Sequence, residues 1–430
     1  MSENNRRTFI QQAAGAGVAT VALSAVSESR GANERVRVGL IGCGGRGRGV
    51  ADMFRQRNDV DLVYLADPNN GRLTQAAAQF GGKIKTTGDF REMIDGDSVD
   101  AVIVATPVHW HAPATVVCCR AGKHVYVEKP CSHNLREGRV MVEAARAHDC
   151  VVQHGTQVRS TSTMIEAVDA LRNGVIGKVL TAKAWNIQRR PGAGRGANAK
   201  PPRDLDFEMW LGPVPPIEYY DGVISQWNWS RHFGTGEIGN DGIHDIEYAR
   251  WGLGVDQHPQ RIAGMGGRYT YHNGAEFPDT QQVCYEFAAE NGSDKQMLIY
   301  EERLWSTNYP HNCDSGVEFY GDRGQMFLSR RGKCEVHLDR NQRKPLDIKL
   351  EAQNTNSHIA DFIDAIRNKR RSNADIELGH LTTSLCHLGN IAIRLGRNLQ
   401  FDHAAEQFKD DQEANSLLVR TYRDDHWAKL

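Results

Sequence analysis

The stretch V-R-V-G-L-I-G-C-G-G-R-G, residues 36–47, decides the fold of this chain. Its first six residues are mostly apolar and predict a buried strand. Gly42, Gly44 and Gly47 then supply the spacing G-x-G-x-x-G. The first glycine allows a tight turn, the second lets a pyrophosphate approach the backbone, and the third lets the next helix pack closely. Because the N-terminus of that helix attracts an anion, the stretch predicts a dinucleotide-binding turn.

An acidic residue in the expected place supports this prediction. A second apolar strand, Val60–Ala66, ends in Asp67, twenty residues after Gly47. A carboxylate there accepts hydrogen bonds from ribose hydroxyls and repels a 2′-phosphate, so we expect NAD rather than NADP. The alternative is an ordinary glycine-rich turn beside a solvated aspartate. The residues expected to contact the cofactor in this region are Gly42, Gly44, Gly45, Arg46, Gly47 and Asp67.

Length and composition limit the other possibilities. The 430 residues leave room for two or three domains. Hydrophobic residues make up 40% and charged residues 24% of the chain, and the formal net charge of −1 gives no sign of a nucleic-acid surface. The nine cysteines follow no metal or disulfide spacing, so no disulfide framework is expected.

The N-terminus has the pattern of an export signal. Arg6 and Arg7 precede a mildly apolar run, Ala13–Val26, which is too short to span a membrane comfortably as a mature helix. A twin arginine before such a run is typical of a twin-arginine signal peptide; the alternative is a basic tail followed by a short helix. We expect residues 1–31 to be this signal, the mature protein to be periplasmic, and no stable membrane insertion after the signal is removed.

The order of the predicted elements indicates an α/β protein with two sheets. Strands and helices alternate over residues 34–155, which predicts a doubly wound parallel sheet. Strands then follow one another over residues 261–338 and predict an open, mostly antiparallel sheet. We assign residues 156–350 to this substrate and oligomerisation domain, and residues 351–430 to helices that pack back on the core. One sheet face is left to be covered, so a homodimer or tetramer is expected.

Polar residues follow two apolar strands at the carboxyl edge of the parallel sheet, where ligands of such sheets bind. The strand Ala101–Ala105 precedes a loop whose expected cofactor contacts are Thr106, Pro107, His109 and His111. His109 and His111 have no third metal ligand nearby in sequence, so no metal is expected.

The second of these strands, His124–Val127, leads into Glu128, Lys129 and Pro130. Glu128 and Lys129 are also expected at the cofactor. A lysine beside a nicotinamide can shuttle a proton if its surroundings lower its pKa from about 10.4. The alternative is a surface ion pair between Glu128 and Lys129.

A third polar cluster lies in the stretch 234–251. If this stretch is helical from Asn240, then Asn240 and His244 lie one turn apart on one face, which Glu247 and Tyr248 continue. A histidine that titrates near neutrality suits proton transfer. The alternative is a core histidine packed against the sheet.

Together these motifs resemble the Gfo/Idh/MocA family of oxidoreductases. The resemblance covers about residues 35–400 and rests on G-L-I-G-C-G-G-R-G, Asp67, A-T-P-V-H-W-H, the E-K-P at residues 128–130 and the helix with His244. It implies a Rossmann domain joined to an α/β domain with an open, mostly antiparallel sheet. It also implies hydroxyl–keto interconversion on sugars or polyols with NAD or NADP, the family lysine at Lys129 and the family histidine at His244.

The chain departs from the family pattern at one position. Polyol dehydrogenases of the family commonly have an aspartate four residues before the histidine, where this chain has Asn240 followed by Asp241. Since asparagine cannot accept a proton, either Lys129 and His244 suffice, or Asp241 or Glu247 takes that part. The N-terminus and this variant resemble the exported branch of the family, which implies a tightly held cofactor.

Three functions remain open. The leading one is an NAD-dependent oxidoreductase for a sugar or polyol, with Lys129, His244, Asn240 and Asp241 as catalytic candidates. The second is a glycosidase or lyase that oxidises a sugar transiently with bound NAD. The third is a sugar-binding protein without catalysis, against which the presence of Lys129 argues. None of the three involves nucleic acid.

Overall fold

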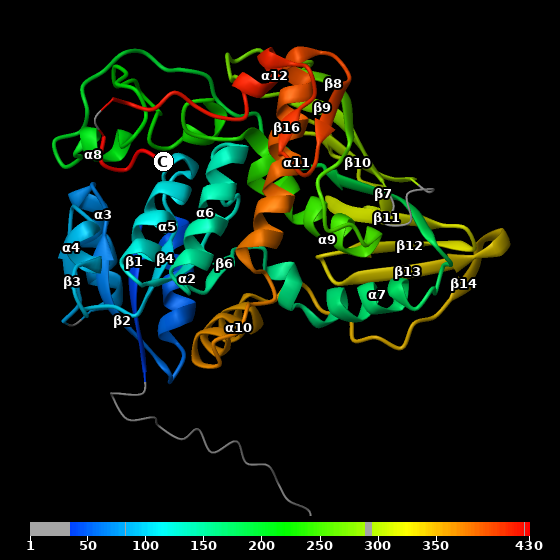
Figure 1. The fold of residues 1–430 in the computed structure, drawn as a ribbon, viewed down its shortest axis with the longest axis horizontal. Coiled ribbons are helices and arrows are strands. Elements are labelled where there is room, and N and C mark those ends of the chain that lie inside the picture. The colour runs from blue at the N-terminus through cyan, green and yellow to red at the C-terminus, as the bar shows by residue number, and fades with distance from the viewer. Residues whose placement is uncertain (1–34, 82, 289–294, 425) are drawn as a thin grey trace, which may run out of the picture.

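The computed structural model describes residues 35–81, 83–288, 295–424 and 426–430. The expected signal over residues 1–31 lies outside them. The chain forms a parallel sheet with helices on both faces and a second, larger sheet, joined by a long central helix (Figure 1). The predicted α/β class is therefore confirmed. No helix of the described residues is long and apolar enough to cross a membrane.

The first sheet has six parallel strands in the order β3-β2-β1-β4-β5-β6. The chain order reverses beside β1, which opens a crevice at the carboxyl ends of β1 and β4. The strands are β1 (Val36–Ile41), β2 (Val60–Ala66), β3 (Lys85–Thr87), β4 (Ala101–Val104), β5 (His124–Val127) and β6 (Val152–His154). The sequence pattern does not predict β3, because Lys85 and Thr86 are exposed.

Two apolar layers hold helices on the faces of this sheet. One surrounds Met93, Val102 and Val125, and the other surrounds Leu40, Phe54 and Ile103. The helices are α2 (Gly45–Arg55), α3 (Asn70–Phe80), α4 (Arg91–Ile94), η2 (Val108–Trp110), α5 (His111–Arg120) and α6 (Leu135–Ala147).

A helix from late in the chain joins the second of these layers. This helix, α10 (Thr355–Arg367), places Phe362 edge-on to Phe54 and Tyr126 at ring distances of 6.0 and 6.1 Å. The last part of the chain therefore returns to the parallel sheet.

The second sheet has the strand order β14-β13-β12-β11-β7-β10-β9-β8-β15-β16 and is antiparallel apart from the pair β7–β10. Its strands are β7 (Val179–Asn186), β8 (Arg261–Gly267), β9 (Thr280–Ala288), β10 (Lys295–Arg303), β11 (Ser315–Gly321), β12 (Gly324–Ser329), β13 (Lys333–Leu338), β14 (Gln342–Lys344), β15 (Leu399–Asp402) and β16 (Gln407–Phe408). The predicted open, mostly antiparallel sheet is confirmed. The last segment of the chain adds β15 and β16 to it as well as helices.

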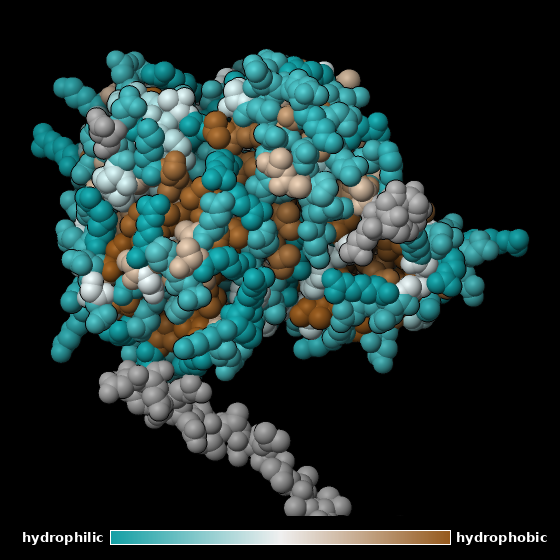
Figure 2. All heavy atoms as spheres, in the orientation of Figure 1, coloured by the Kyte–Doolittle hydropathy of each residue, from teal (hydrophilic) through white to brown (hydrophobic). Residues whose placement is uncertain are grey.

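Helices cover one face of the large sheet. They are α7 (Ser162–Arg172), α9 (Ile243–Leu253) and α11 (Ile376–Leu395), and α11 runs between the two domains (Figure 1). On the opposite face, side chains such as Lys183, Met297 and Glu318 remain partly or largely exposed. Seen from the side of Figure 1, the surface is mostly hydrophilic, with apolar residues between the polar ones (Figure 2).

The long segment between β7 and α9 folds back over the parallel sheet. It contains α8 (Phe207–Leu211), η4 (Trp227–Trp229) and its own apolar cluster around Trp210 and Phe233. Backbone hydrogen bonds of 2.8 Å from Asn70 to Asp204 and of 2.9 Å from Asp206 to Pro68 fasten it beside β2. The remaining short turns and helices are η3 (Gln157–Ser160), η5 (Ile238–Gly242), η6 (Pro310–Asn312), η7 (Asp339–Asn341) and α12 (Gln412–Ser416).

Candidate active site

A cavity of about 620 Å³ lies at the carboxyl edge of the parallel sheet. Its wall combines the glycine turn after β1, the ends of β2, β4 and β5, the start of α9 and the segment that folds over the sheet. It therefore lies where open α/β sheets bind their ligands.

Two glycines of the turn at one end of the cavity, Gly42 and Gly47, have no room for a side chain. Gly42 has a φ of +95°, and a Cβ there would lie 2.6 Å from the carbonyl oxygen of Ala105. A Cβ on Gly47 would lie 2.0 Å from the carbonyl oxygen of Gly42, so this glycine allows α2 to pack against the turn. No side chain caps α2, whose N-cap is Gly44, and the backbone N–H groups of its first turn are available to a phosphate. This end fits a dinucleotide pyrophosphate.

Asp67 lies buried in the same wall. Its Oδ2 accepts a hydrogen bond of 2.7 Å from the backbone N–H of Cys43, and its Oδ1 one of 2.8 Å from that of Asn69. Burial raises the pKa of the carboxyl group, and these two N–H groups oppose the rise. A carboxylate has about four acceptor positions, so two remain for ribose hydroxyls. Arg72 also lines the cavity and brings a positive charge to this end.

Lys129 reaches the cavity from the end of β5. Its Nζ donates hydrogen bonds to the backbone carbonyl of Asn240 and, at 3.3 Å, to the Asn240 side-chain oxygen. Burial lowers the pKa of the ammonium group, and the carboxylates of Glu128 and Asp241 oppose this. The lowered pKa brings Lys129 closer to the range in which an amine exchanges protons.

Glu128 pairs mainly with Arg46 and not with the neighbouring lysine. Arg46 Nη2 lies 2.6 Å from Glu128 Oε1, and Arg46 Nε donates to the same oxygen at 2.8 Å. Although burial alone would raise the pKa of Glu128, Arg46 and Lys129 hold it below its usual value. The carboxylate is therefore ionised and holds Arg46 beside the glycine turn.

A π-turn begins the helix on the other side of the cavity. Residues Ile238–Gly242 form this wider turn, and α9 continues from Ile243. Such turns insert one extra residue into a helix and are frequent at functional sites. As a result Asn240, Asp241 and His244 all line the cavity.

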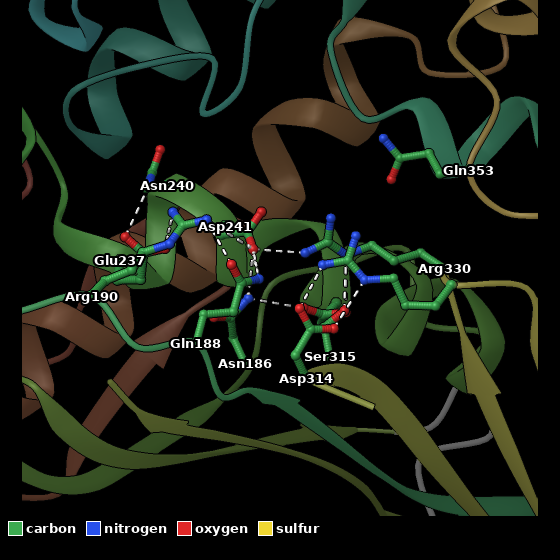
Figure 3. Close-up of polar contacts among 12 residues, drawn as sticks. Asn186, Gln188, Arg190, Glu237, Asn240, Asp241, Asp314, Ser315, Arg330 and Gln353 are labelled. Atoms are coloured by element: carbon green, nitrogen blue, oxygen red, sulfur yellow. Dashed lines mark hydrogen bonds and ion pairs between the residues drawn. The ribbon is translucent and has the colours of Figure 1, made fainter. Parts of the chain in front are cut away.

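Asp241 is the most heavily bonded of these residues. Its Oδ2 accepts from Arg330 Nη2 at 2.7 Å, from Asn186 Nδ2 at 3.0 Å and from Gln188 Nε2 (Figure 3). Burial alone would raise the pKa of Asp241, but Arg330 and Lys129 hold it well below its usual value. Asp241 is therefore ionised at the cavity wall.

His244 is neutral. Burial, Arg330 and Lys129 lower the pKa of its imidazole well below the usual value, and Asp241 only partly opposes them. Its Nδ1 is buried and has no hydrogen-bond partner among the described residues. A neutral imidazole in the cavity wall can accept a proton or a hydrogen bond from a hydroxyl group.

Glu237 holds the side chain of Asn240 in position, and Arg190 in turn holds Glu237. Asn240 Nδ2 donates to Glu237 Oε2 at 3.0 Å, and Arg190 Nη1 lies 2.5 Å from Glu237 Oε1 (Figure 3). Burial raises the pKa of Glu237 to about 7, although Arg190 opposes the rise. The amide of Asn240 is thus fixed with its oxygen toward Lys129.

Two family models match the chain. One is described as an oxidoreductase family with an NAD-binding Rossmann fold and matches residues 36–156. The other is described as the C-terminal alpha/beta domain of the same oxidoreductase family and matches residues 322–428. The chain belongs to the Gfo/Idh/MocA family of oxidoreductases. Its parallel-sheet domain is accordingly an NAD-binding domain.

Curated relatives of this family member carry two kinds of name. An inositol 2-dehydrogenase of Rubrobacter xylanophilus is 26% identical over 69% of this chain and 72% of its own length. A myo-inositol 2-dehydrogenase of Thermotoga maritima is 32% identical over 33% of this chain and 42% of its own length. A glycosyl hydrolase family 109 protein of a Shewanella species is 29% identical over 35% of each chain. The chain thus spans less than half the length of two of these three relatives.

Solved structures share the fold of this Gfo/Idh/MocA protein. A levoglucosan dehydrogenase in complex with NADH and levoglucosan has a TM-score of 0.65 at 20% identity, over 85% of this chain and 99% of that chain. An aldose-aldose oxidoreductase from Caulobacter crescentus, complexed with glycerol, has a TM-score of 0.65 at 19% identity, over 85% of this chain and 100% of that chain.

Most residues expected from the sequence lie together in the cavity wall. They are Gly42, Gly44, Gly45, Arg46, Asp67, Thr106, Pro107, His111, Glu128, Lys129, Asn240, Asp241 and His244. Gly47 lies behind the turn. Glu247 is not in this wall, because it pairs with Arg159 at 2.5 Å inside the protein.

His109, like Gly47, is an expected cofactor contact that the structure does not place in the cavity wall. The short turn Val108–Trp110 directs its ring into the core, where its Nε2 lies 2.9 Å from the Trp210 carbonyl oxygen and the ring packs on Phe233. His111 faces carbonyl oxygens with both ring nitrogens, at 2.6 and 2.9 Å. Both histidines are therefore engaged by the backbone.

Several cavity residues carry no motif in the sequence. Arg330 follows β12, and Gln353 lies in the segment before α10. Both line the cavity although each comes more than eighty residues after Asp241 in the chain. Gln353 Nε2 donates to Gln157 Oε1 at 2.7 Å, whereas its own Oε1 has no partner among the described residues. Gln353 therefore offers a free acceptor to a ligand.

A group of potential metal ligands lies outside the cavity wall. His258 and His380 each bring Nε2 to 2.9 Å from Glu406 Oε1. Arg139 also lies 2.6 Å from that oxygen. The Arg139 guanidinium already neutralises the Glu406 carboxylate. Hydrogen bonds therefore explain why the two histidines lie beside it.

Proposed function

We propose that this protein is an NAD-dependent oxidoreductase that interconverts a hydroxyl and a keto group of a sugar or polyol. One observation carries the proposal: Lys129 from the cofactor domain and His244 from α9 line the same cavity, beside the ionised Asp241. NAD, when bound, supplies the hydride acceptor for alcohol oxidation.

The residues of the cavity wall have different roles in the proposed proton transfer. Lys129 Nζ, in its neutral form, takes the proton of the reacting hydroxyl, and burial lowers its pKa toward this task. His244 accepts a hydrogen bond from the substrate through its neutral ring. Asp241 is ionised and stabilises the positive charge that Lys129 gains. Asn240 orients the ammonium group through the hydrogen bonds to its two oxygens.

The polar wall on the side of α9 supports a substrate rich in hydroxyl groups. Arg330, Gln353 and Asn240 present donors and acceptors to the cavity from three separate elements. Names of relatives point the same way, because inositol and levoglucosan are a polyol and a sugar derivative.

A second candidate function is hydrolysis or elimination through transient oxidation of a sugar. The similarity to glycosyl hydrolase family 109 proteins favours it. It uses the same Lys129 and His244, but the hydride returns to the product and no NADH accumulates.

One experiment tests both candidates. The protein with NAD is incubated with a panel of free polyols, free sugars and aryl glycosides, while NADH and released aglycone are measured together. We expect NADH to form with at least one polyol or sugar and no aglycone to appear. Aglycone release without NADH would assign the second function, and neither signal with any compound would contradict both.

We also propose that the cofactor is tightly held and that the mature protein is periplasmic. Met209, Trp210, Ile224 and Trp227 of the segment over the sheet line the cavity, so a bound dinucleotide is partly covered. The twin-arginine pathway carries folded proteins, which suits a cofactor that travels bound. Mass spectrometry of the purified, denatured protein is expected to find NAD.

A further inference from the structure

A second cavity, of about 560 Å³, lies on the side of α11 that faces the C-terminal tail. Its wall contains Arg231, Arg268, Arg394 and Arg420, against a single carboxylate, that of Glu276. It shares no wall residue with the candidate active site. The cavity is therefore a separate space whose wall carries more arginines than carboxylates.

Two of the arginines form no ion pair in the described part of the chain. The side chains of Arg231 and Arg394 make no hydrogen bond or ion pair with a carboxylate among the described residues, and both are exposed. Glu276 accepts instead from the backbone N–H of Arg231, at 2.7 Å. Two guanidinium groups that repel each other across a cavity favour the binding of an anion between them.

Buried polar atoms in the same wall also lack partners. Asn134 is 5% exposed; its Oδ1 caps α6 by accepting from the Glu137 N–H at 3.0 Å, but its Nδ2 has no partner among the described residues. Arg420 is only partly engaged: its Nε lies 2.6 Å from Glu137 Oε1 and its Nη2 donates to the His109 carbonyl at 2.9 Å, but its Nη1 has no hydrogen-bond partner among the described residues. Leaving buried donors unpaired costs free energy, which a bound acceptor would recover.

We propose that this second cavity binds a small oxyanion of the phosphate or sulfate type. Arg231 and Arg394 supply the charge, and Asn134 Nδ2 and Arg420 Nη1 donate from the inner wall. A tetrahedral oxyanion offers several acceptor oxygens and matches this set of donors, because guanidinium groups bind it through paired N–H groups.

The test is calorimetric titration of inorganic phosphate into the full chain at constant ionic strength, with NAD saturating so that the glycine turn is occupied. We expect saturable binding by the wild type, weakened at least about tenfold in Arg394→Gln. Asn134→Asp keeps the helix cap but replaces the free donor by a negative charge, and it should abolish binding. Arg343→Gln, which removes an exposed arginine on β14, is the matched control and should bind normally.

Three results would contradict the proposal, and each can be told from the others. No phosphate binding by the wild type, or equal binding by wild type and Arg394→Gln, would overturn the proposal. If Arg394→Gln instead dissociates an oligomer and the wild type binds no phosphate, the arginines serve a contact with a carboxylate of another copy. Binding that is seen only when NAD is left out would overturn the proposal too and assign phosphate to the dinucleotide end of the first cavity.

Discussion

The ammonium group of Lys129 donates hydrogen bonds to both oxygens of Asn240, the backbone carbonyl and the side-chain amide. These two residues belong to different domains and lie 111 positions apart in the chain. The contact fixes the proposed proton acceptor relative to the helix that carries His244. Catalysis therefore depends on how the two domains meet.

Replacing Lys129 tests its chemical role. Lys129→Met keeps most of the side-chain volume, so the variant should bind NAD and melt close to the wild type. Loss of a positioned proton-transfer group costs about 10²–10⁴ in rate. The measurement is single-turnover reduction of bound NAD by a saturating substrate. Lys183→Met, on the open sheet face, is the control, and a Lys129→Met rate within threefold of wild type would remove this lysine from the mechanism.

Replacing Asp67 tests the choice of cofactor. The wild type should bind NADH at least about tenfold more tightly than NADPH, because the Asp67 carboxylate repels a 2′-phosphate. Asp67→Asn removes the charge but keeps an acceptor, and Arg72 nearby then attracts the phosphate. The preference should fall in fluorescence titrations with both nucleotides. Asp61→Asn, at the surface of the same strand, should leave it unchanged; tighter NADPH binding by the wild type would contradict the assignment.

The buried carboxyl group of Glu302 makes the free energy of unfolding depend on pH. Burial and the neighbouring Glu237 raise the pKa of its carboxyl to about 8, above the ordinary 4.5, so the folded protein holds a proton that the unfolded chain releases. This contribution is complete below about pH 4.5 and is lost as the pH rises through 8. In Glu302→Gln the loss is absent, so the variant should gain stability relative to the wild type between pH 5 and 8. Urea unfolding across this range measures it, and parallel pH profiles would refute the assignment.

The open face of the large sheet should mediate self-association. Met297 is 37% exposed there and lies on the face that the helices leave free. Light scattering should give a dimer or tetramer for the wild type and a smaller species for Met297→Glu. Leu350→Glu, which charges an exposed leucine elsewhere, is the control. A wild-type monomer at micromolar concentration would show that the face needs no partner.

The N-terminal arginines should direct export. Replacing both Arg6 and Arg7 by lysine should retain the protein in the cytoplasm, because the translocase reads the arginine side chains themselves. Cell fractionation measures the distribution. Arg30→Lys, outside the pair, should export normally, and an unchanged periplasmic yield of the double variant would argue against the signal.

The sequence predicts the two sheets because their signals are local. Apolar runs such as Val36–Ile41 and Ala101–Val104 mark buried strands, and glycines mark the turn that follows β1. Strands of two or three residues, such as β14 and β16, have too few side chains to show a period.

The candidate site is only partly visible in the sequence for a related reason. Lys129 and His244 lie in motifs, whereas Arg330 and Gln353 are brought to the cavity by the pairing of distant segments. His109 and His111 are two residues apart, and nothing in their sequence says that the turn between them buries one ring and leaves the other in the wall.

Which side chains face the cavity from α9 depends on the number of residues in the π-turn Ile238–Gly242. A regular α-helix rotates by about 100° per residue, so a deletion that converted this turn to an ordinary one would rotate Asn240 and Asp241 by that angle relative to α9. The same two side chains would then point into the core and no longer into the cavity. Alignments that place a gap in this turn would therefore pair residues with different surroundings, and designs that transplant the His244 helix must carry its extra residue with it.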